Sequence, residues 1–215
     1  MRSTTTGALV PSINITLTGY QGPSTSFGGV DMSVALSSLW LPILLSAVVV
    51  FIASSLIWTV IQYHNSDWHK LPDEEAARHA LKGVAPGEYT VPHAADSRAR
   101  RSPEWQERYR EGPAVMLSVL PHGSMAMGKQ LVLWFSYCLI ISLLVGYVAA
   151  AALGAGTEYL KVFQVTGTTS LLAYAGGAAA GAIWFGHSWS RAVKDVIDGL
   201  IYGLLTAGIF GWLWP

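Results

Sequence analysis

Four long apolar stretches separated by polar segments dominate the chain. They cover about residues 39–62, 131–153, 162–185 and 196–214, and Asp198 is the single Asp, Glu, Lys or Arg inside them. An α-helix needs about 20 apolar residues to cross the hydrocarbon core of a bilayer. Each stretch reaches roughly that length, so the pattern predicts four transmembrane helices.

The apolar residues run continuously and do not alternate with polar ones. Val48–Ile52 and Leu139–Ile141 are unbroken apolar runs, whereas a strand of a membrane barrel alternates between its lipid and lumen faces. An open sheet would leave backbone groups unsatisfied in lipid. We therefore expect an all-α integral membrane protein with four transmembrane helices and one sizeable cytoplasmic loop. The predicted segments are a polar outer N-terminal tail at 1–35, helices at 36–63, 130–154, 160–186 and 190–215, and the loop at 64–129.

Composition supports a membrane protein and says little about partners. The chain is 52% hydrophobic and 12% charged, whereas soluble domains are about 25% charged. Its 13 basic and 13 acidic residues cancel, so net charge indicates no nucleic-acid partner. The single cysteine, Cys138, lies in an apolar stretch and is interpreted as a small packing residue.

Basic residues predict the orientation of the helices. Nine Lys and Arg residues lie in loop 64–129 and two more, Arg191 and Lys194, precede the last helix, whereas Arg2 and Lys161 are on the opposite side. Because basic residues near spans stay in the cytoplasm, we expect this loop inside and both termini outside. The first apolar stretch begins too late and runs too long for a cleaved signal. We expect an uncleaved anchor, with Met32 as an alternative start.

The loop 64–129 carries signals for short elements. Residues 71–83 begin with Pro and acidic residues and end with Lys-Gly, and 102–112 begin with Ser-Pro-Glu; both patterns predict short helices. Residues 88–92 are predicted to be extended. With so few apolar residues, we expect the loop to pack against the inner membrane face or a partner.

Three of the predicted helices carry small residues spaced four apart, which allow helices to approach closely in lipid. These packing positions are Ser142, Gly146, Ala150 and Gly154 in the second helix, Ala173, Gly177 and Gly181 in the third, and Gly199, Gly203, Ala207 and Gly211 in the fourth. We expect these three helices to form a tight unit with the first helix at its side. Alternatively, one of the stripes faces another protein.

A row of polar residues follows one face of the third helix. Thr166, Ser170 and Tyr174 share that face, which allows a polar path through the membrane. The alternative is that these hydroxyls bond to neighbouring helices or to their own backbone.

Asp198 is the charged residue deepest in an apolar stretch. Acidic residues inside a membrane are functional candidates. However, Arg191 and Asp195, and likewise Lys194 and Asp198, are four residues apart on one helix. We therefore expect interfacial ion pairs at these positions, with a proton-coupling role for Asp198 as the alternative.

Histidines near the apolar stretches suggest a metal site as a further alternative. His64, Asp67 and His69 are close in sequence, but the His and Cys spacings of zinc sites are missing, and we interpret Tyr63, His64, Trp68 and His69 as interfacial anchors. No motif for phosphate binding, nucleophilic catalysis or haem attachment is present. We expect no metal, no cofactor and no catalytic residue.

Two segments resemble a known group of proteins. The run 197–215, which ends Phe210-Gly211-Trp212-Leu213-Trp214-Pro215, and the segment 66–75, which begins Ser66-Asp67-Trp68, resemble parts of small uncharacterised bacterial inner-membrane proteins. The resemblance implies a bacterial inner-membrane location and carries no activity.

Three functions remain open. The abundant packing surface favours a non-catalytic accessory or scaffold subunit, partnered by the lipid bilayer and by other membrane subunits or by itself. The polar row on the third helix allows a small oligomeric transporter or channel. The third alternative is a membrane-embedded lipid-modifying enzyme that uses His64, Asp67 and His69.

Overall fold

A computed structural model describes residues 34–123 and 127–215. The predictions for the N-terminal tail and for Met32 lie outside these ranges. The helices are α1 (Trp40–Leu56), α2 (Glu74–Ala80), α3 (Pro103–Glu111), α4 (Met127–Ala152), α5 (Tyr159–Ala175), α6 (Ala178–Phe185) and α7 (Trp189–Trp212), and the strands are β1 (Gly87–Val91) and β2 (Val115–Val119). The chain is therefore mainly helical, as its apolar pattern predicts.

Two helical segments in the described part of the chain are long and apolar enough to cross a membrane. They are Leu36–Ile61, which consists of a 3₁₀ turn, α1 and a π turn, and Met127–Ala152, which is α4; each has 26 residues. The two other predicted spans are also helical, but neither is a long, uninterrupted apolar helix. The third is split between α5 and α6, and the fourth lies in α7, whose first turns carry charged residues.

The third predicted helix is broken, which corrects the expectation of one continuous helix over 160–186. α5 ends at Ala175, and α6 begins at Ala178 after Gly176 and Gly177. A Cβ added at Gly176 would lie 2.4 Å from the carbonyl oxygen of Leu172. The break therefore depends on a position without a side chain, as sharp bends at glycines commonly do.

The small residues of α7 pack directly against α5. A Cβ added at Gly199 would lie 2.6 Å from the Cβ of Ala175, and one at Gly203 would lie 3.1 Å from the backbone oxygen of Gly167. Ala207 is buried beside Gly167 in the same interface. The backbones of α5 and α7 can lie this close only because one partner at each contact is a glycine or alanine.

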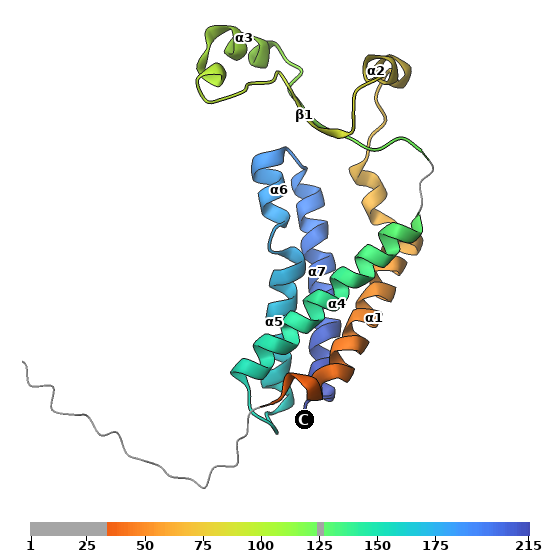
Figure 1. Ribbon diagram of the computed structural model, residues 1–215, viewed down its shortest axis with the longest axis vertical. Coiled ribbons are helices and arrows are strands. Elements are labelled where there is room, and N and C mark those ends of the chain that lie inside the picture. The colour runs from red at the N-terminus through yellow and green to blue at the C-terminus, as the bar shows by residue number, and fades with distance from the viewer. Residues whose placement is uncertain (1–33, 124–126) are drawn as a thin grey trace, which may run out of the picture. The chain divides into compact units, whose positions relative to one another are not determined.

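The small residues of α4 pack against α1, which corrects the prediction that the first helix lies at the side. Ser142 Oγ donates a hydrogen bond to the Ile43 backbone oxygen at 2.8 Å, and a Cβ at Gly146 would lie 3.1 Å from the Ile43 side chain. α1 also contacts α7, and α4 contacts α5, but the most extensive pairings are α1 with α4 and α5 with α7 (Figure 1).

The interior has two apolar clusters. One includes Leu39, Val145, Val162 and Phe210 and lies toward the start of α1. The other, toward the end of α1, includes Ala47, Val50, Ile57, Cys138 and Tyr202. Cys138 is fully buried there as a free thiol. Tyr202 packs against aromatic residues of other helices in this second cluster, one turn after Asp198 on α7.

The segment between α1 and α4 contains more structure than its sequence predicts. Helices α2 and α3 are present, and each is capped by a side chain: Asp73 accepts from the Ala76 amide and Ser102 from the Trp105 amide. The predicted extended segment is β1, which pairs antiparallel with β2. β2 was not predicted, because its partner lies about 30 residues earlier and its own five residues give a weak signal.

Candidate functional site

The end of α1 turns the chain back toward α7. The π turn Ile57–Ile61 ends at Gln62, which has a φ of 55° and donates its backbone N–H to the Ile57 oxygen at 2.8 Å. A 3₁₀ turn, Tyr63–Asp67, follows at once. A positive φ is uncommon for a residue other than glycine, and π turns occur frequently at functional sites. The backbone is therefore unusual at Gln62, directly before the polar residues Tyr63, His64 and Asp67.

His64 is buried between two carboxylates. Its Nδ1 lies 3.2 Å from Asp67 Oδ2, and its Nε2 lies 3.1 Å from Asp198 Oδ2. Trp58 stacks flat on the imidazole, with ring centroids 4.4 Å apart. His64 is only 2% exposed, so its predicted role as an interfacial anchor is wrong. The carboxylate–histidine chain, as we call it, consists of Asp67, His64 and Asp198.

Asp198 is held on both of its oxygens. Oδ2 faces His64, and Oδ1 accepts a hydrogen bond from the Tyr63 hydroxyl. The residue is 6% exposed. The predicted interfacial pair of Asp198 with Lys194 is therefore not formed, because the turn after α1 supplies both partners of this carboxylate.

Lys194 pairs with Asp67 instead. Its Nζ donates to Asp67 Oδ1 at 2.6 Å, to Ser66 Oγ at 2.8 Å and to the Tyr63 backbone oxygen at 3.0 Å. The Lys194 ammonium holds the pKa of the Asp67 carboxyl below its usual value, which outweighs the opposing effect of burial. Lys194 therefore fastens the turn after α1 to α7.

The predicted Arg191–Asp195 pair is also not formed. The guanidinium of Arg191 lies 5.5 Å above the Trp68 ring, and within the described residues Asp195 makes no ion pair. Trp68, just beyond the 3₁₀ turn, competes for Arg191 because a guanidinium packs well on an aromatic face. The Asp195 carboxylate consequently has no cation of its own.

A cleft of about 600 Å³ opens at the break between α5 and α6 and reaches Asp198. Its lining residues come from the π turn after α1, from α4, α5, α6 and α7, and from the connections on either side of α6. They are mainly aromatic, charged or very small: Trp58, Trp134, Tyr137, Ala173, Tyr174, Gly177, Ala178, Gly181, His187, Arg191, Asp195, Asp198, Gly199 and Tyr202. A Cβ at Gly177 would meet no atom within 4 Å. The helix break and the missing side chain at Gly177 together leave this space open.

The predicted polar path is closed along most of its length. Thr166 and Ser170 are fully buried between α5 and α7. Thr166 Oγ1 donates to its own backbone at Val162, and Ser170 Oγ donates to Thr206 Oγ1. Of the three residues proposed for the path, only Tyr174 lines the cleft. The cleft is therefore a site at one end of the helix bundle.

His69, His122 and His187 do not belong to the carboxylate–histidine chain. His69 and His122 are exposed, and His187 lines the cleft. Across residues 34–123 and 127–215, no group of three His, Cys, Asp or Glu side chains is arranged to hold a metal ion.

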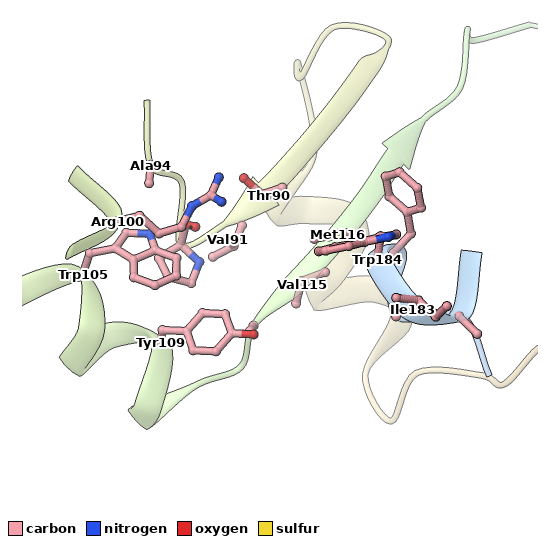
Figure 2. Close-up of a pocket in the computed structure, with 15 residues that line it drawn as sticks. Thr90, Val91, Ala94, Arg100, Trp105, Tyr109, Val115, Met116, Ile183 and Trp184 are labelled. Atoms are coloured by element: carbon pink, nitrogen blue, oxygen red, sulfur yellow. Dashed lines mark hydrogen bonds between the residues drawn. The ribbon is translucent and has the colours of Figure 1, made fainter. Parts of the chain in front are cut away.

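A second pocket, of about 680 Å³, lies between the β1–β2 hairpin, α3 and the end of α6. Figure 2 shows Trp105 and Arg100 on one side of it and Trp184 on the other. Arg100 is the single charged side chain among its lining residues. This second pocket contains no buried network of ionisable groups. The cleft at Asp198 is therefore the stronger candidate site.

The sequence identified most members of the site without predicting their arrangement. The sequence predicted an ion pair for Asp198 and an interfacial anchor for His64. It suggested Asp67 only as a ligand of a candidate zinc site. The roles of Tyr63 and Trp58 were missed, although both are polar-tipped aromatics at the end of an apolar stretch. Comparison with protein-family models, curated proteins and solved structures finds no match to this chain, so the geometry is the basis for its function.

Proposed function

We propose that the chain is a small transporter with four membrane-spanning segments, working as an oligomer in a bacterial inner membrane. In this proposal α5 with α6, and α7, supply the third and fourth spans. The excess of Lys and Arg in loop 64–129 supports a cytoplasmic loop and outer termini. The cleft would then open at the cytoplasmic end of the helices, and its solute would be coupled to a proton on the carboxylate–histidine chain.

The observation that carries this proposal is the position of His64 between two carboxylates. A neutral imidazole has one N–H donor, and an ionised carboxylate can only accept. Both contacts of His64, to Asp67 and to Asp198, can be hydrogen bonds only when the chain holds one additional proton. Buried chains of carboxylates and histidines are typical of proton relays in membrane transporters.

Asp198 connects that proton to the cleft. It is both the last member of the chain and a lining residue of the cleft. A solute that interacts with the Asp198 carboxylate changes how strongly the chain holds its proton, and the reverse holds by linkage. Lys194 and Asp67 mark the other end of the chain, where the Lys194 side chain is 16% exposed and water can exchange the proton.

A second candidate is an accessory subunit, and the loop carries the observation that favours it. Val91, Met116 and Leu120 in and beside the β1–β2 hairpin are 52%, 60% and 70% exposed. Exposed apolar side chains on a two-stranded sheet suit a protein partner. Co-purification of a foreign subunit that is lost when Met116 and Leu120 are changed to Ser would favour this candidate.

The transporter proposal is tested in liposomes that contain the full chain and a trapped pH-sensitive dye. Inward gradients of small cationic, anionic and neutral solutes are applied in turn. At least one class should change the internal pH, and Asp198→Asn and His64→Gln should each reduce that change at least tenfold. Glu107→Gln and His79→Gln, at exposed positions outside the site, should leave it unchanged. An internal pH that responds to no class would exclude proton-coupled transport of such solutes.

A further inference from the structure

We infer that the cleft binds a monovalent organic cation, a protonated or quaternary amine, and that this cation and the proton of the carboxylate–histidine chain replace one another. The inference rests on the proposed function, since it names the class of solute that the cleft would take. Charge balance, the cleft walls and the space at Gly177 support it.

The charges around the cleft leave one negative charge unmatched. Three carboxylates, Asp67, Asp195 and Asp198, face two permanent cations, Lys194 and Arg191. Lys194 pairs with Asp67 at 2.6 Å. Arg191 packs on the Trp68 ring and is the one permanent cation that lines the cleft together with Asp195 and Asp198. One further positive charge makes the site neutral, and either a proton on the chain or a monovalent cation in the cleft supplies it. Asp198 is buried, at 6% exposure, and neutrality is favoured around it because unpaired buried charge is costly.

The walls of the cleft favour an organic cation. Five aromatic residues line it: Trp58, Trp134, Tyr137, Tyr174 and Tyr202. The rings of Tyr174 and Tyr202 meet edge to face at 5.2 Å, and Trp134 stacks on Tyr137 at 5.5 Å. Aromatic faces attract organic ammonium groups, which are weakly hydrated. A hydrated metal ion would instead need a shell of oxygen ligands, and the described residues place no such cluster here.

Competition with the proton gives the expected pH dependence its sign. When the chain loses its proton, the unmatched negative charge attracts a cation, so cation binding should strengthen as the pH rises. The other titratable groups at the cleft are His187, which is exposed, and the hydroxyls of Tyr137, Tyr174 and Tyr202. His187 protonation would act in the same direction, and for this reason His187→Gln is included as a separate variant.

Gly177 offers a direct way to fill the cleft. A side chain there meets open space, and its backbone φ of −91° suits any residue. Gly177→Leu should therefore occupy the cleft without disturbing the helices. Gly128→Leu is the matched control, because Gly128 also has no neighbour within 4 Å of an added Cβ and lies at the exposed start of α4.

The experiment is calorimetric titration of the full-length protein in detergent with choline and with its uncharged analogue 3,3-dimethyl-1-butanol. Choline should bind and the alcohol should not. Choline affinity should be at least about fivefold higher near pH 8 than near pH 6, and this ratio should disappear in His64→Gln but persist in His187→Gln. Gly177→Leu should abolish binding, Asp195→Asn should weaken it about fivefold, and Gly128→Leu should match the wild type.

Equal binding of the alcohol and choline, or choline binding that ignores pH and Gly177→Leu, would overturn the inference. Asp195→Asn keeps the volume of the side chain, so it tests the charge even if Gly177→Leu fails to fold. The two proposals fail differently. A liposome response to anions alone refutes the cation and leaves the transporter standing, whereas choline binding without any internal pH change supports the cation and refutes coupled transport.

Discussion

At the scale of single residues, the site depends on how few hydrogen-bond donors it holds. His64, Tyr63 and Lys194 supply the donors for the carboxylates of Asp67 and Asp198. Each carboxylate is buried, with side-chain exposures of 4% for Asp67 and 8% for Asp198. Removing one donor leaves a buried charge without its partner, which costs far more than a surface substitution.

The first prediction concerns His64. His64→Ala should lower the free energy of unfolding by about 3–5 kcal/mol, because it removes the buried partner that Asp67 and Asp198 share. His79→Ala, at an exposed position in α2, should change it by less than about 0.5 kcal/mol. Thermal unfolding of the purified variants, followed by tryptophan fluorescence, measures the difference. Equal stability of the two variants would show that the carboxylate–histidine chain does not hold the end of α1 to α7.

The second prediction concerns the pH dependence of stability. The pKa of Asp67 is lowered in the folded protein by Lys194. Its stabilising contribution is therefore complete above the unfolded value of about 4 and is lost as the pH falls through the lower, folded value. Lys194→Met should lower the melting temperature at neutral pH and flatten its fall in this acidic window. An unchanged acid profile would mean that the Lys194–Asp67 contact contributes little.

At the scale of elements, close approach of helices depends on particular glycines. α7 carries glycines that differ sharply in what surrounds them. A Cβ at Gly199 would lie 2.6 Å from Ala175, whereas one at Gly208 would only touch the Tyr159 hydroxyl at 4.0 Å. Both were equally visible as glycines in the sequence, but only Gly199 belongs to the spacing of four that predicted the interface.

The third prediction compares these two glycines. Gly199→Ala should destabilise the protein by about 1–3 kcal/mol, because the new methyl group forces α5 and α7 apart. Gly208→Ala should be neutral or stabilise it by up to about 1 kcal/mol, since alanine favours a helix where space allows. Melting temperatures of the two variants test this. A reversed order would mean that α5 and α7 do not meet at Gly199.

The elements also show what sequence can and cannot predict. Hydropathy located each long helix that the described residues contain, since each apolar stretch is a local property of the sequence. It did not find the break at Gly176, because a glycine pair inside an apolar stretch is often tolerated in a helix. The small-residue pattern predicted α4 beside the third and fourth predicted helices. α4 does contact α5, but it packs more extensively on α1, because small residues predict a close contact and do not say which helix supplies the other side.

At the scale of the whole molecule, the site joins segments that are far apart in the sequence. His64 and Asp198 are 134 positions apart, and no local pattern connects them. Each residue taken alone had a simpler interpretation, as an anchor or an ion-pair partner. The carboxylate–histidine chain forms only when folding brings the end of α1 and the start of α7 together. The candidate site could therefore be predicted only as separate residues.

The fourth prediction tests the proposed orientation. In a Cys138→Ser background, Glu107→Cys in α3 and Glu158→Cys before α5 place one thiol each on opposite sides of the predicted membrane. A membrane-impermeant maleimide added to intact cells should label the cysteine at position 158 and should reach position 107 only after the cells are opened. Labelling of both positions in intact cells would contradict a cytoplasmic loop.

The flat stacking of Trp58 on His64 gives the protein a built-in optical reporter. The two rings are nearly parallel, with an interplanar angle of 2°, and a protonated imidazole in contact with an indole quenches its fluorescence. The emission of Trp58 should therefore fall whenever the additional proton of the carboxylate–histidine chain rests on His64, and no added dye is needed to detect it. The protein has nine tryptophans, so the Trp58 fluorescence is obtained as the difference between the wild type and Trp58→Phe. A stopped-flow instrument would then time the arrival and departure of the proton.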